Sequence, residues 1–216
     1  MKRPKSKYPG DAAFQRLLER YDCPTPFHVV RMRFLGGIAS LDFDISPIKT
    51  IGAFWGGDLP VFDHKEEASA LFQAMMVLWR RMARHQDGAL VKLFKPGKLR
   101  TWDDIAAALR MRAEEIQNGF LVGFSGRGED RHLPRDLEKA LHGLQKIAAH
   151  FEESAERVQG PQRIEDKMSF DDYRQLLGVR TKKVESLLTA IMRASMAFRK
   201  LGIAAAPEIN DGALIH

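Results

Sequence analysis

Hydrophobic residues recur at helical spacing along nearly the whole chain. Phe14, Leu17, Leu18 and Tyr21 form the first such stripe. Apolar residues three and four positions apart share one face of an α-helix, so this spacing predicts an amphipathic helix. Similar stripes predict further helices at about 27–39, 46–57, 63–82, 101–124, 134–151, 169–178 and 181–201. The pattern therefore predicts an all-α protein, in which only residues 90–100 favour a short strand or an extended connector.

Residues that favour helix N-termini stand before several of these stripes. Ser46 precedes a proline, and serine accepts backbone hydrogen bonds at a helix start while proline suits the first turn. Asp63 with Glu66, and Thr101 with Asp104, have the three-residue spacing of a capping box. These signals predict helix starts at the three positions.

Two short segments echo each other, each an aromatic and aliphatic run interrupted by glycine. They are Phe34-Leu35-Gly36-Gly37-Ile38 and Gly119-Phe120-Leu121-Val122-Gly123-Phe124. Glycine inside a helix costs about 1 kcal/mol relative to alanine. It is useful beside large apolar residues where another backbone approaches closely or where a helix ends. The echo therefore predicts close helix packing.

The domain organisation follows from breaks in this pattern. The strongest break is Gln159-Gly160-Pro161, which separates a helical bundle at 11–158 from a C-terminal helical hairpin at 165–201. The hairpin either docks on the bundle or completes its core. Residues 1–10 are expected to be a disordered basic tail, and residues 202–216 a second tail.

Composition limits the class of protein. The chain has 216 residues, of which 44% are hydrophobic, and it lacks an apolar run near the length of about 20 that crosses a bilayer. Its basic start is not followed by the apolar core of a secretory signal, so a cytoplasmic protein is expected. Cys23 is the only cysteine, which excludes an internal disulfide. The net charge of +6 favours an acidic partner such as nucleic acid, although the basic residues are spread through most helices.

The segment at 118–124, Asn-Gly-Phe-Leu-Val-Gly-Phe, resembles the YecA/YgfB-like family of bacterial proteins, as does the helix predicted after it. The resemblance covers roughly residues 14–153 and includes the Phe-Leu-Gly-Gly core and the proline-led helix. Ile116 stands where family members often have tryptophan, Arg33 stands where a glycine is usual, and a cysteine-rich zinc-binding tail is absent. The resemblance implies an all-helical fold and an adaptor or regulatory role. It implies no reaction, no catalytic residue and no cofactor.

Candidate chemistry is sparse. Asp42 and Asp44 lie two residues apart in a predicted loop, and their carboxylates could bind a divalent cation. With Asp58 they would form a metal-dependent hydrolase, but an acidic turn and helix capping explain the same residues more simply. No nucleophile is accompanied by a base. The sequence therefore predicts a protein that is not an enzyme, with no catalytic residues, no cofactor and no metal.

The C-terminal region has the spacing of a helix-turn-helix. Residues 176–179, Leu-Leu-Gly-Val, would form the turn of a unit spanning 169–191. Arg180, Lys182 and Lys183 would then begin the second helix, where base edges and phosphates are contacted. The second helix continues apolar through Met192 and Met196, which favours an ordinary core hairpin instead.

The leading functional hypothesis is a non-enzymatic cytoplasmic adaptor or regulator that acts through protein–protein contacts. Its contact surface would include Trp55 and Phe62, which precede the helix expected at 63, although core packing is the other interpretation of each aromatic. The alternative hypothesis is a nucleic-acid-binding regulator that uses Arg180, Lys182 and Lys183. The sequence indicates neither the identity of the partner nor the oligomeric state.

Overall fold

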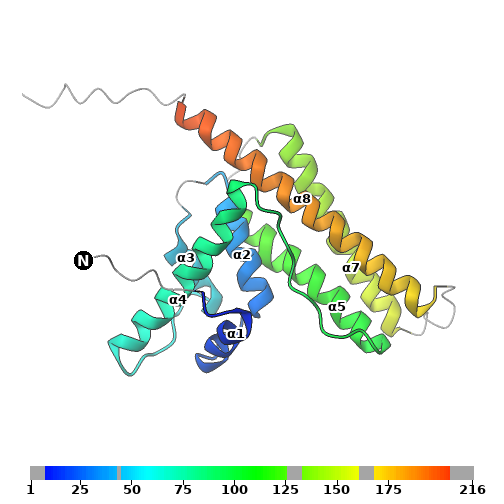
Figure 1. The fold of residues 1–216 in the computed structure, drawn as a ribbon, viewed down its shortest axis with the longest axis horizontal. Helices are drawn as coiled ribbons and strands as arrows, with labels where there is room; N and C mark the ends of the chain where they lie inside the picture. Colours follow the sequence, from blue (N-terminus) through cyan, green and yellow to red (C-terminus); the bar gives the residue numbers. More distant parts are fainter. Residues whose placement is uncertain (1–7, 43–44, 126–132, 161–167, 205–216) are drawn as a thin grey trace, which may run out of the picture.

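The protein is all-helical, as a computed structural model that describes residues 8–42, 45–125, 133–160 and 168–204 shows (Figure 1). No strand occurs in these four ranges, so the predicted all-α class is confirmed. The elements are α1 (Asp11–Arg20), α2 (Phe27–Ala39), α3 (Pro47–Gly52), the 3-10 turn η1 (Ala53–Trp55), α4 (Lys65–Ala83), the 3-10 turn η2 (Arg84–Asp87), α5 (Trp102–Glu114), the π-helical stretch η3 (Glu115–Leu121), α6 (Val122–Ser125), α7 (Arg135–Gln159) and α8 (Phe170–Ala204).

The two echoing glycine segments pack against each other, which confirms the predicted close approach. Helix α2 crosses η3 and α6, and glycines line both sides of the crossing. A Cβ atom added to Gly36 would meet the carbonyl oxygen of Phe120 and would lie 2.8 Å from the backbone nitrogen of Phe124. On the other side, a Cβ on Gly119 would lie 2.6 Å from the Cβ of Met32. Side chains would force these backbones apart.

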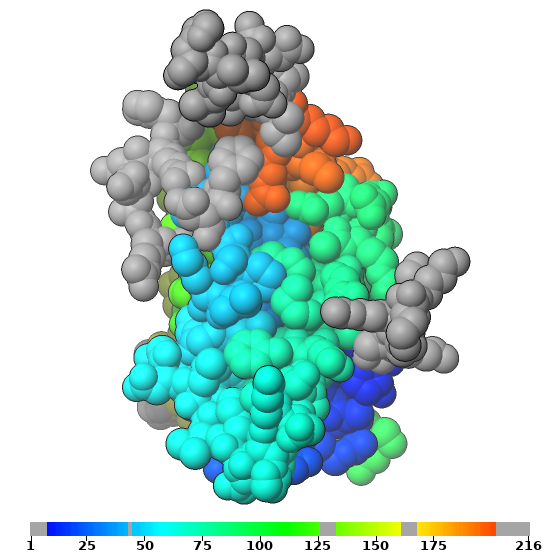
Figure 2. Space-filling model, turned by 90° about the vertical axis from the view of Figure 1, so that its left-hand side faces the viewer, coloured from blue at the N-terminus to red at the C-terminus, as the bar shows by residue number. Residues whose placement is uncertain are grey.

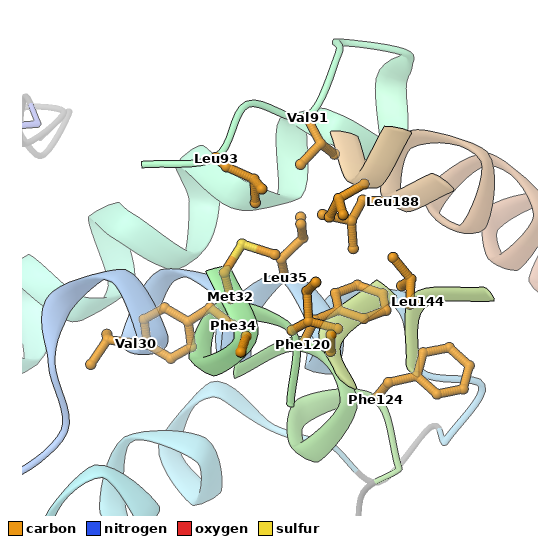
Figure 3. Close-up of a cluster of buried hydrophobic side chains, with 14 of the residues drawn as sticks. Val30, Met32, Phe34, Leu35, Val91, Leu93, Phe120, Phe124, Leu144 and Leu188 are labelled. Carbon is orange, nitrogen blue, oxygen red and sulfur yellow. The ribbon is translucent and has the colours of Figure 1, made fainter. Parts of the chain in front are cut away.

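A single buried cluster joins the crossing to the C-terminal helices. Phe34 and Phe120 lie in it together with Leu144 of α7 and Leu188 of α8 (Figure 3). Helix α5 packs along α7, and α8 contacts α7, α5 and α2. The C-terminal helix therefore completes the core of the bundle and does not form a separate unit on its surface.

The turn predicted at residues 176–179 is wrong, because α8 continues through it as one helix of 35 residues. Tyr173, Leu177, Val184 and Leu188 are all buried and form one stripe at helical spacing, which a turn would interrupt. Gly178 lies on an open side of this helix, because no neighbouring atom lies within 4 Å of its Cβ position. The C-terminal helical pair is formed by α7 and α8.

Two of the three predicted helix caps are confirmed. The Ser46 side chain accepts a hydrogen bond from the backbone of Lys49, and Thr101 forms a complete capping box with Asp104. The cap predicted at Asp63 is wrong. Helix α4 begins at Lys65, and extended backbone at His64 moves Asp63 outside the N-cap position.

Residues 89–100 form an extended segment, named the strap here, that crosses α8 and α5. Its backbone has no neighbouring strand among the described residues, so side chains supply the hydrogen bonds. The N–H of Val91 donates to Thr189 Oγ1 at 3.1 Å, and the N–H of Leu93 donates to Glu185 Oε1 at 3.1 Å. Val91 and Leu93 point into the buried cluster near Leu188 (Figure 3). The predicted extended connector is thereby confirmed.

The ends of the described chain are more ordered than the predicted tails. Residues 1–7 and 205–216 lie outside the described residues. Tyr8 belongs to the structure, stacks on Phe14 and donates a hydrogen bond to Asp11 at 2.6 Å. Helix α8 includes residues 202–204, so the helical part of the chain is longer than its apolar stripe predicts.

Candidate partner-binding surface

The loop between η1 and α4 exposes apolar side chains at the outer end of the bundle. Gly56 and Gly57 have φ values of 76° and 112°, which glycine adopts without strain, and they lead the chain away from η1. Val61 then stands 95% exposed and Leu59 40% exposed. The loop joins the N-terminal end of α4, at the lower left of Figure 1. Single exposed apolar residues are common on protein surfaces, but Val61 and Leu59 are exposed two residues apart in one loop.

A shallow hollow of about 380 Å³ lies beside this loop. Trp55, Tyr21, Pro60 and Val61 supply its apolar lining, while Arg20 and Asp22 border it. Trp55, Tyr21, Leu59, Pro60 and Val61 together are named the loop surface here. Its residues come from the C-terminal end of α1, from η1 and from the loop, so the fold brings separate parts of the sequence to one place.

Trp55 and Phe62, the two predicted contact residues, are both half-buried against the core. The Trp55 indole N–H donates to the carbonyl oxygen of Tyr21 at 2.8 Å. Phe62 packs edge-on against the Tyr21 ring, with 5.5 Å between the ring centroids. Trp55 lines the hollow, whereas Phe62 supports Tyr21 from beside it. Trp55 thus combines core packing with partial exposure in the hollow.

Charged groups surround the apolar centre. Arg20 and Glu67 form an ion pair of 2.6 Å that joins α1 to the first turn of α4. Three exposed carboxylates lie in the adjoining loops: Asp22 follows α1, and Asp58 and Asp63 lie between η1 and α4. An apolar centre within a polar surround is the composition typical of protein–protein interfaces.

Of the carboxylates considered for a metal site, Asp42 and Asp58 lie in different loops. Asp42 follows the C-terminal end of α2, and its N–H donates to Ser40 Oγ at 3.1 Å. Asp58 lies in the exposed loop after η1, and Asp44 is outside the described residues. Within the described ranges, no three His, Cys, Asp or Glu side chains form a group suited to a metal ion.

Cys23 lies behind the loop surface and is expected to react slowly. Its thiol donates weakly to the carbonyl oxygens of Thr25 at 3.6 Å and Phe54 at 3.7 Å, and burial raises the pKa of the thiol. Because the thiolate is the nucleophile, alkylation by iodoacetamide at neutral pH should be about tenfold or more slower than in urea-unfolded protein. Equal rates in the folded and unfolded protein would show that this part of the fold is open.

Arg180, Lys182 and Lys183 lie in the middle of α8 and not at the start of a helix. Arg180 reaches α7, where it donates to the carbonyl oxygen of His150 at 3.4 Å and to Ser154 Oγ at 3.3 Å. Lys182 and Lys183 are exposed. Without the predicted turn, these residues do not form the recognition helix of a helix-turn-helix.

Sequence reasoning found Trp55 but missed Val61 and the hollow. The signal was present as an apolar run, Leu59-Pro60-Val61-Phe62, that follows two glycines and precedes a charged helix start. Its exposure depends on the direction in which the loop leaves η1, which the local sequence does not specify.

Comparison with known proteins gives no match to a family model, a curated protein or a solved structure. The resemblance to the YecA/YgfB-like family therefore stays a prediction. Of the helices in the described ranges, none has the length and apolar character required to cross a membrane.

Proposed function

We propose that this protein is a cytoplasmic, non-enzymatic adaptor or regulator that binds a protein partner through the loop surface. The observation that supports this most directly is the 95% exposure of Val61 beside a hydrogen-bonded tryptophan and a hollow. Tryptophan and tyrosine are enriched among the residues that dominate the energy of protein interfaces, and Trp55 and Tyr21 both line the hollow. The resemblance described above implies the same role.

The loop surface is suited to binding because part of it is already fixed. The hydrogen bond of Trp55 to Tyr21 holds the indole in one orientation, so little side-chain freedom is lost when a partner covers it. Covering Val61 would add about 1.5 kcal/mol of hydrophobic stabilisation. A partner that places one apolar side chain in the hollow would cover Val61 and would also contact the Trp55 indole, which is already held in one orientation.

A photo-crosslinking amino acid at Leu59 tests the proposal. In living cells it should yield one discrete crosslinked protein, and Val61→Asp should reduce that product at least about tenfold, since a charge replaces the apolar contact. The same amino acid at Lys146, which is exposed on α7, serves as the control position.

Thermal unfolding of the Val61→Asp protein distinguishes lost binding from lost folding. An exposed substitution should leave the midpoint almost unchanged. The same products from positions 59 and 146, or a product that Val61→Asp does not reduce, would contradict a partner at the loop surface.

A further inference from the structure

Basic residues without acidic neighbours in the sequence occur in two helices. From residue 68 to residue 86, which covers most of α4 and nearly all of η2, the chain has three arginines and no Asp or Glu. From residue 186 to the end of α8 it has two arginines and one lysine, again with no Asp or Glu. By contrast, residues 58–67 contain four carboxylates and one lysine. Positive charge is therefore concentrated away from the loop surface.

The fold places these two basic stretches next to each other. Arg193 of α8 donates to the carbonyl oxygen of Gly88, directly after η2, at 3.5 Å. Figure 1 shows the C-terminal end of α4 beside α8, and in Figure 2 the orange end of α8 adjoins the blue-green end of α4. The two stretches thus share one side of the molecule, opposite the loop surface along α4.

Four cations in these two neighbouring stretches are exposed. Arg80 and Arg84 are four residues apart, and Arg193 and Lys200 are seven apart, so each pair lies on one stripe of its helical segment. These four residues are named the basic face. Among the described residues, none of the four forms an ion pair with a carboxylate.

Other charged residues lie near the basic face. Arg81 lies over the Tyr8 ring at 4.6 Å, and the half-buried Arg199 donates to the carbonyl oxygen of Ser40. Arg193 also donates to a backbone carbonyl, that of Gly88, but its side chain stays exposed. Asp87 is exposed and lies three residues after Arg84 in η2, although no ion pair joins the two, and Asp42 is half-buried beside Arg199. The α4 macrodipole favours Arg80 and Arg84 near its C-terminal end. It does not explain Arg193, which lies well before the end of α8.

We propose that the basic face binds the phosphate backbone of a nucleic acid. Three of its four cations are arginines, whose planar guanidinium donates two parallel hydrogen bonds to phosphate oxygens. Cations without carboxylate partners can contact phosphates without first breaking an ion pair. The face is separate from the loop surface, so this inference does not depend on the proposed protein partner.

The salt dependence follows from the number of cations. Four phosphate contacts on duplex DNA give a slope of about −3.6 for log affinity against log salt, so affinity should fall roughly 100-fold between about 50 and 200 mM salt. The contacts involve phosphates and not base edges, so duplexes of different sequence should bind alike.

The test measures binding of the full-length protein to short duplex DNA and to single-stranded RNA over a range of salt concentrations. The variant Arg84→Glu/Arg193→Glu should weaken binding at least about tenfold and make the salt slope shallower by about two. The matched control is Lys182→Glu/Lys183→Glu, which changes net charge equally at exposed positions of α8. It should bind within about twofold of the unchanged protein.

Several results would overturn the inference. These are no binding at low salt, equal loss in both variants, loss only in the Lys182/Lys183 variant, or no loss in either variant, as binding through residues 1–7 would give. Phe198 and Leu201 are also exposed near the end of α8, so vesicles of anionic lipid are measured in parallel. Tighter binding to these vesicles than to nucleic acid would identify a membrane surface instead.

Discussion

Gly36→Ala is expected to lower the free energy of unfolding by about 3 kcal/mol, the upper range for overpacking a core. The added Cβ would meet the backbone of Phe120 and of Phe124. Backbone atoms cannot move aside by a rotamer change, so α2 would have to separate from η3 and α6 along the crossing. Urea unfolding followed by circular dichroism measures the loss.

Gly178→Ala is the matched control, because Gly178 is also a helical glycine but has nothing within 4 Å of its Cβ position. There alanine should raise stability by up to about 1 kcal/mol through its higher helix propensity. If Gly178 were in a left-handed turn, the same change would destabilise the protein. Equal effects at both glycines would contradict the close crossing.

Local sequence was sufficient for most of the elements, though not for the unbroken α8, and for the role of the glycines at the crossing. Helical spacing predicted the helices, and glycine among large apolar residues predicted a close approach of backbones. That Gly36 meets Phe120 and Phe124 depends on how α2 crosses a segment more than eighty residues away. The periodicity of one helix does not indicate the angle at which that helix crosses another segment.

The C-terminal region shows how a local pattern can mislead. Gly178 after two leucines is compatible with a turn and equally with the exposed side of a helix. The buried stripe from Tyr173 to Leu188 decides between them, because a single long helix covers α7 and α5 together. Tertiary burial outweighed the cost of about 1 kcal/mol for one glycine.

Other features left no distinct signal in the sequence. Arg112 and Glu115, three residues apart, look like an ordinary surface ion pair on a helix, yet both are buried. The strap covers them, and nothing in residues 89–100 indicates which helices it will cross. For the same reason the hollow beside Val61 could not be predicted, since α1 and the loop form it together.

Glu115→Met is expected to destabilise the protein by about 3–5 kcal/mol, because it leaves the buried Arg112 without its partner. Glu115 is 1% exposed, forms an ion pair with Arg112, and accepts the N–H of Phe94 in the strap at 3.0 Å. Arg112 also donates to the carbonyl oxygen of Phe94 at 2.5 Å and to Thr181 of α8 at 3.3 Å. The pair therefore joins α5, the strap and α8, and the urea midpoint should fall accordingly.

A double-mutant cycle with Arg112→Met separates the ion pair from simple packing. The variant without both charges should be more stable than Glu115→Met alone, since no uncompensated charge stays buried. Burial raises the pKa of Glu115 above its usual 4.5, and Arg112 opposes that rise. In Arg112→Met the folded state therefore retains the Glu115 proton more strongly than the unfolded state, and its stability should fall as pH rises above about 4.5. A pH-independent difference in stability between Arg112→Met and the double variant would show that burial does not raise the pKa of Glu115 in the folded state.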